Sequence, residues 1–116
     1  MAQDACVNLI DTADVYSEGL SEQIVGEALG GSRDDVLIAT KVRMPMRDGS
    51  NDAGCRGTTS CAGPRRACAG WAPTTWTYQV HEWDGQTPMD ETLSELDSLV
   101  QSGKVRYIGA SNYAVW

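Results

Sequence analysis

Four short apolar runs recur along the chain, separated by polar or turn-like segments. They occupy residues 7–10, 36–40, 78–80 and 105–110. Runs of this length are too short for buried helices and are typical of strands that are covered on both faces. The pattern therefore predicts a sheet of about four strands.

An amphipathic segment between the first two runs predicts a helix. Ser21 is a candidate N-cap, Glu22 lies in the positively polarised first turn, and Gly30-Gly31 supply the stop. The expected apolar face of this helix comprises Ile24, Val25, Ala28 and Leu29.

A second helix is predicted between the third and fourth runs. Thr87 is the expected N-cap, Pro88 the first helical residue, and Gly103 the left-handed residue past the end. Its expected buried stripe comprises Leu93, Leu96, Leu99 and Val100.

A strand, a helix and a strand in this order predict a right-handed parallel crossover, and hence an α/β fold with a parallel sheet. The four runs end in groups that can hold or move a proton or a hydrogen bond, namely Asp11, Lys41, His81 and Ser111-Asn112. Equivalent ends of parallel strands lie on one rim, so these groups are expected to converge there, with Tyr16 close behind Asp11. The plainer alternative makes Asp11 a turn cap, Tyr16 and His81 packing residues, and Lys41 a surface lysine.

Residues 55–77 differ from the rest of the chain. They show a period of neither 3.6 nor 2, and Cys, Pro and Gly recur through them. This pattern predicts an irregular segment, although loops longer than about 15 residues are uncommon inside compact domains.

Length and charge limit the function classes. The chain has 116 residues, which is one domain or a piece of one, and a net charge of −7. This charge argues against nucleic acid or anionic membrane as a partner. No apolar stretch approaches the roughly 20 residues that cross a bilayer, and no signal peptide is recognisable, so a soluble, cytoplasmic protein is expected.

The four cysteines do not form a recognisable metal site. Cys55, Cys61 and Cys68 lack a C-x2-C pair, and the chain has one histidine. A disulfide framework would imply export. No metal is therefore expected, and a cysteine-rich metal-binding module is a minor alternative.

Five motifs resemble the aldo-keto reductase family, whose members are (β/α)8 barrels that use NADPH, less often NADH. The motifs are D-T-A-D-V-Y at 11–16, S-E-Q-I-V-G-E-A-L at 21–29, A-T-K-V at 39–42, Y-Q-V-H at 78–81 and G-K-V-R-Y-I-G-A-S-N at 103–112. The resemblance covers most of the chain except residues 55–77.

The resemblance implies roles for individual residues. The family's catalytic tetrad falls on Asp11, Tyr16, Lys41 and His81, and its contacts to the nicotinamide carboxamide fall on Ser111 and Asn112. Carbonyl reduction needs a hydride on carbon and a proton on the developing alkoxide. The Tyr16 phenol would give that proton, Lys41 would favour its phenolate, Asp11 would hold Lys41, and His81 would donate a hydrogen bond to the carbonyl oxygen.

A complete barrel needs about 250 residues, so residues 1–116 are expected to form an incomplete barrel domain of about four strand-helix units. The family's opening strand would precede Met1 and its last three would follow Trp116. Cys6 stands where the family usually has glycine, which is expected to strain a turn. For residues 55–77 we hypothesise a shift of the coding frame, because a shifted frame reads as an amphipathic helix that enters a strand.

The leading functional hypothesis is NAD(P)H-dependent reduction of an aldehyde or ketone to an alcohol, with activity impaired by truncation. One alternative is a non-catalytic, cofactor-binding regulatory barrel that resembles the potassium-channel beta subunits, and another is an inactive fragment. The sequence names neither the carbonyl substrate nor the oligomeric state.

Overall fold

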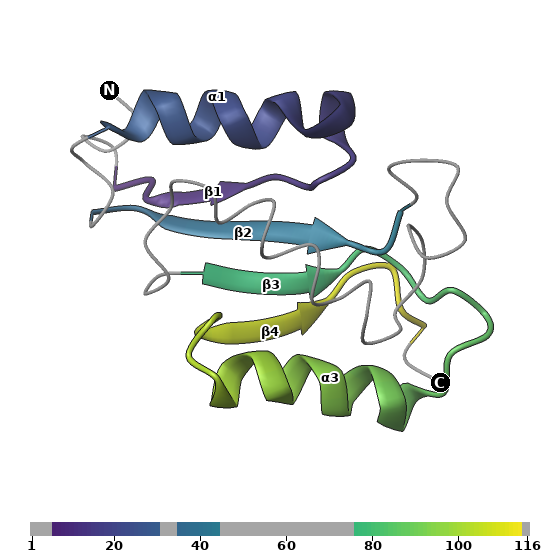
Figure 1. The fold of residues 1–116 in the computed structure, drawn as a ribbon. Helices are drawn as coiled ribbons and strands as arrows, with labels where there is room; N and C mark the ends of the chain where they lie inside the picture. Colours follow the sequence, from purple (N-terminus) through teal and green to yellow (C-terminus); the bar gives the residue numbers. More distant parts are fainter. Residues whose placement is uncertain (1–5, 31–34, 45–75, 115–116) are drawn as a thin grey trace.

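All four predicted strands form, and they pair in one parallel sheet (Figure 1). The computed structural model describes residues 6–30, 35–44 and 76–114. The sheet has the order β1-β2-β3-β4, and its strands are β1 (Leu9–Asp11), β2 (Leu37–Val42), β3 (Trp76–Val80) and β4 (Tyr107–Ala110). Sequential parallel pairing confirms the predicted α/β architecture.

Main-chain hydrogen bonds continue past the carboxyl ends of the strands. Thr12 N–H donates to the Ala39 carbonyl (2.8 Å), and Asp14 N–H donates to the Lys41 carbonyl (3.0 Å). His81 N–H likewise bonds the Val42 carbonyl (2.8 Å). The loops that follow β1 and β3 are thus both fastened to β2, which brings the polar strand ends to one edge.

Two α-helices flank the sheet. A 3-10 turn, η2 (Tyr16–Gly19), leads from β1 into α1 (Leu20–Leu29), and α3 (Met89–Gln101) connects β3 to β4. Figure 1 shows α1 on the β1 side of the sheet and α3 on the β4 side. Residues 55–75 of the predicted irregular segment lie outside the described residues, as does most of the proposed frame shift, whereas Trp76 and Thr77 belong to β3.

Both predicted N-caps are wrong by one or two positions. Helix α1 begins at Leu20 with Gly19 as its N-cap residue, because the left-handed glycine (φ 91°) turns the chain out of η2 directly into the helix. Helix α3 begins at Met89 with Pro88 as its N-cap residue. The Thr87 hydroxyl donates instead to Asp84 Oδ2 (2.5 Å).

The apolar face predicted for α1 is partly wrong. Its buried residue is Glu22, and Ile24 is 55% exposed. Val25 and Leu29 are half-buried as expected, but Ala28 is exposed. The helix is rotated toward Glu22 because the Thr40 hydroxyl on β2 hydrogen-bonds the Glu22 carboxyl.

The stripe predicted for α3 is largely confirmed. Leu96 and Leu99 are buried and Val100 packs against the same core, but Leu93 is 50% exposed and Thr92 takes the buried position. Gly103 has φ 69° and terminates the helix as expected. The core beneath α3 comprises Val42, Tyr78, Val80, Leu96, Leu99 and Val105.

Cys6, which was expected to strain a turn, has a φ of 60°. This left-handed region favours glycine, since a Cβ atom crowds the backbone there. The structure agrees with the expectation for this position.

The different environments of two α3 leucines predict different costs of truncation. Leu99→Ala removes a side chain that is 1% exposed and should lower the free energy of unfolding by about 2–5 kcal/mol. Leu93→Ala, on the same helix, should change it by no more than about 0.5 kcal/mol. Urea unfolding followed by circular dichroism measures both, and equal losses would contradict this packing of α3.

Candidate active site

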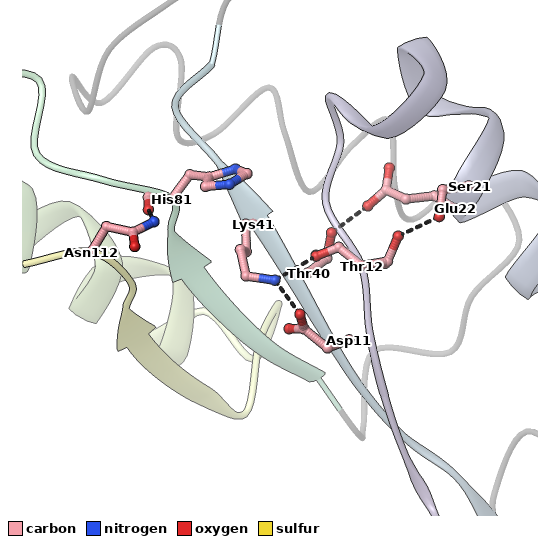
Figure 2. Close-up of polar contacts among 8 residues, drawn as sticks. All are labelled: Asp11, Thr12, Ser21, Glu22, Thr40, Lys41, His81 and Asn112. Carbon is pink, nitrogen blue, oxygen red and sulfur yellow. Dashed lines mark hydrogen bonds and ion pairs between the residues drawn. The ribbon is translucent and has the colours of Figure 1, made fainter. Parts of the chain in front are cut away.

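The Lys41 ammonium forms an ion pair with the Asp11 carboxylate (Figure 2). Lys41 lies within β2 and is 7% exposed, whereas Asp11 ends β1 and its side chain is 51% exposed. Nζ of Lys41 also donates to the Thr12 carbonyl oxygen (3.2 Å). A buried ammonium needs such partners, because desolvation without them is costly.

Tyr16 reaches the same place through a sharp turn. Nζ of Lys41 is 5.7 Å from the centroid of the Tyr16 ring, which is partly exposed. The two residues after it, Ser17 and Glu18, have left-handed backbone angles, φ 52° and 57°. Such angles are strained for residues other than glycine and cluster at functional sites. Through this strained turn the chain passes from Tyr16 into α1, and the Tyr16 residue is 41% exposed near Lys41.

His81 follows β3 and completes the group. Its ring lies edge-on to Tyr16, with 5.9 Å between centroids and an interplanar angle of 80°. Asn112 Nδ2 donates to the His81 carbonyl oxygen (3.0 Å), and the main chain of Asn112 is left-handed (φ 54°). Among the described residues, His81 Nδ1 is buried and has no hydrogen-bond partner.

The structure therefore brings together the four residues that the resemblance assigns to catalysis, Asp11, Tyr16, Lys41 and His81. Of the two expected cofactor contacts, Asn112 is fastened to His81 by its side chain. Ser111 is held at the end of β4 by its main chain, whose N–H donates to the Val80 carbonyl (2.9 Å). The geometry places these residues but does not by itself test their roles.

A cluster of four polar residues, which we call the α1 polar cluster, was not predicted. It joins α1 to the first two strands and comprises Thr12, Ser21, Glu22 and Thr40. Burial raises the pKa of the Glu22 carboxyl above its ordinary value of 4.5, and the hydrogen bond from Thr40 partly opposes this. The available signal was a glutamate at a helix position that spacing assigns to the same stripe as Val25 and Leu29.

An ion pair between Arg43 and Glu82 was also missed. Nη1 of Arg43 donates to Glu82 Oε1 (2.5 Å), and Nη2 lies 3.5 Å from the Trp83 carbonyl oxygen. The main chain of Arg43 has a φ of 119°. This pair ties the loop after β2 to the loop after β3, next to His81.

Three of the four cysteines, Cys55, Cys61 and Cys68, lie outside the described residues. Cys6 is exposed and free. Within the part of the chain that the structure describes, no three His, Cys, Asp or Glu residues group as metal ligands. No helix among residues 6–30, 35–44 and 76–114 is long and apolar enough to cross a membrane.

Sequence comparison now identifies relatives. The model of the Aldo/keto reductase family matches residues 1–116. An uncharacterized oxidoreductase, YrpG of Bacillus subtilis, is 40% identical over 99% of this chain and 39% of its own length. Methylglyoxal reductase YeaE of Escherichia coli is 36% identical over 91% of this chain and 34% of its own length. The chain thus spans well under half of the length of these relatives.

Solved structures agree in fold. The aldo-keto reductase AKR11C1 of Bacillus halodurans, in its holo form, matches with a TM-score of 0.84 and 32% identity over 96% of this chain and 38% of its own. The glycerol dehydrogenase AKR11B4 of Gluconobacter oxydans matches with a TM-score of 0.85 and 33% identity. The match covers 98% of this chain and 37% of that protein's chain. The four strands described above therefore form a partial (β/α)8 barrel, as predicted.

The buried Glu22 predicts a dependence of stability on pH. Below pH 4.5 its carboxyl is protonated in both the folded and the unfolded chain. As the pH rises above that value, the unfolded chain releases the proton while the folded chain retains it, so stability falls until the raised folded pKa is passed. Glutamine has no ionisable group, so Glu22→Gln should not lose stability in this way as the pH rises.

Urea unfolding of both proteins at a series of pH values between about 4 and 8 tests this. As the pH rises, the free energy of unfolding of Glu22→Gln should increase relative to that of the original chain. Parallel curves would show that the Glu22 carboxyl ionises alike in both states.

Proposed function

The chain belongs to the aldo/keto reductase family, and from this premise we propose that its site reduces an aldehyde or ketone to an alcohol with NAD(P)H. The observation that carries the proposal is the meeting of the Asp11–Lys41 ion pair with the rings of Tyr16 and His81 at the carboxyl edge of the sheet. Residues 1–116 would contribute this site as part of one barrel domain.

Tyr16 is the proposed proton donor. As the carbonyl carbon is reduced, its oxygen becomes basic and takes the phenolic proton. The Lys41 ammonium, 5.7 Å from the ring centroid, favours the phenolate that remains. Asp11 keeps Lys41 charged and oriented, because its carboxylate pairs with the same ammonium.

His81 is the proposed hydrogen-bond donor to the carbonyl oxygen. Its ring packs edge-on against Tyr16, so the phenol and the imidazole border the same space. A donor aimed at the place where negative charge develops stabilises the transition state. Together the two rings would orient a small carbonyl substrate.

Ser111 and Asn112 are the proposed contacts for the carboxamide of a nicotinamide cofactor, NADPH or alternatively NADH. When bound, that cofactor supplies the hydride. Asn112 fits this role because its Nδ2 donates to the His81 carbonyl oxygen, which fixes the side chain and leaves Oδ1 as the acceptor of the amide. An amide oxygen suits the N–H2 group of a carboxamide.

The Tyr16 phenol provides the decisive test. Tyr16→Phe removes the hydroxyl but keeps the ring, and it should lower kcat by at least about 100-fold, the range expected for general acid catalysis. Carbonyl-dependent oxidation of NADPH, followed by its absorbance over a panel of aldehydes and ketones, measures the loss.

Tyr107→Phe is a matched control, because Tyr107 begins β4 and is 58% exposed. It should retain the original rate. Full activity of Tyr16→Phe would refute the assignment of Tyr16. Cofactor binding without turnover by the original chain would favour the regulatory barrel instead.

A further inference from the structure

The α1 polar cluster lies next to Lys41 and Asp11, two of the proposed catalytic residues (Figure 2). Thr40 precedes Lys41 in β2, and neighbouring residues of a strand project to opposite faces. Lys41 therefore faces Asp11 on one side of β2, while Thr40 faces helix α1 on the other. Thr12 occupies the corresponding position immediately after Asp11.

Hydrogen bonds connect this cluster tightly. The Thr40 hydroxyl donates to Glu22 Oε1 (2.5 Å), and the hydroxyls of Thr12 and Ser21 are 2.8 Å apart. Thr12 and Thr40 are each 1% exposed and Glu22 is 8% exposed. A buried carboxyl is costly, and apolar residues of similar volume often give equal or greater stability. What the polar contacts add is a fixed geometry.

Two residues of the cluster, Thr12 and Thr40, connect it to Lys41. Thr12 holds Ser21 through its hydroxyl and accepts a hydrogen bond from Lys41 Nζ through its carbonyl oxygen (3.2 Å). Thr40, the residue before Lys41, anchors the main chain of β2 through its hydrogen bond to Glu22. Movement of α1 would therefore shift both Nζ and its acceptor.

We propose that Glu22 is a positioning residue for the reaction: by holding Thr40 against α1, beside the Ser21–Thr12 contact, it sets the place of the Lys41 ammonium relative to Asp11 and Tyr16. This rests on the proposed function, in which Lys41 acts on the Tyr16 phenol. A protonated Glu22 carboxyl serves equally, since its carbonyl oxygen still accepts from Thr40. Orientation within such a site controls rate, and small displacements are costly.

Three variants separate this role from folding. Thr40→Val removes the hydroxyl that donates to Glu22 and leaves the Glu22 carboxyl buried without this hydrogen bond. Thr40→Val combined with Glu22→Leu removes both partners, a change that can be nearly neutral for stability. Glu22→Gln keeps an acceptor oxygen. Glu27→Gln, at an exposed position of the same helix, is the matched control.

The readout observes Lys41 directly. Lys41 and Lys104 are the two lysines of the chain, so lysine-selective isotope labelling gives two side-chain ammonium environments, with exposed Lys104 as internal reference. We expect the NMR chemical shifts of the Lys41 side chain to change in Thr40→Val and in the double variant, with those of Lys104 unchanged. Glu22→Gln and Glu27→Gln should leave both signals as they are. In the kinetic assay, kcat should fall about tenfold or more in the first two variants, with a smaller change in KM.

Each outcome bears on a separate claim. Unchanged Lys41 chemical shifts in the folded double variant overturn the positioning role, whatever the kinetics show. Failure of Glu22→Gln to preserve the Lys41 signal also overturns it, because the acceptor would then not be what matters. Changed Lys41 chemical shifts in a chain without carbonyl reduction would uphold the positioning of Lys41 and refute the proposed function.

Discussion

The desolvated ammonium of Lys41 is the constraint on which the site depends. A charge that is 7% exposed requires partners, and it finds them in the Asp11 carboxylate and the Thr12 carbonyl oxygen. Both partners come from the end of β1, so the ion pair can form only when β1 lies next to β2, parallel, with Asp11 opposite Ala39. Strand pairing and site chemistry are thus parts of one arrangement.

The site lies between two structural features: the contacts of β2 with helix α1 on one side and the strained turn η2 on the other. Behind β2, the buried hydrogen bond of Thr40 to Glu22 holds helix α1 in place. In front, Ser17 and Glu18 adopt left-handed angles where the chain passes from Tyr16 into α1. Residues in such conformations persist only where surrounding contacts hold them, and the fixed start of α1 supplies that support.

Sequence patterns predicted the strands and their convergence well, because short apolar runs and the parallel crossover rule depend on local spacing. The resemblance then assigned Asp11, Tyr16, Lys41 and His81, which the structure brings together. Helix faces and caps were less predictable. The position of Glu22 on the stripe of Val25 and Leu29 was a local signal for burial, but its hydrogen bond with Thr40, 18 residues away in sequence, carries none. The Arg43–Glu82 pair, 39 residues apart, carries no local signal either.

The two halves of the site are held by different means. Asp11 and Lys41 orient each other through charge, whereas His81 is fixed mainly at its backbone, by Val42 and by the Asn112 amide. No described residue hydrogen-bonds Nδ1 of its ring, and the imidazole contacts the Tyr16 ring edge-on. The Tyr16 ring lies near both the Lys41 ammonium and the His81 imidazole, which places Tyr16 at the junction of both halves.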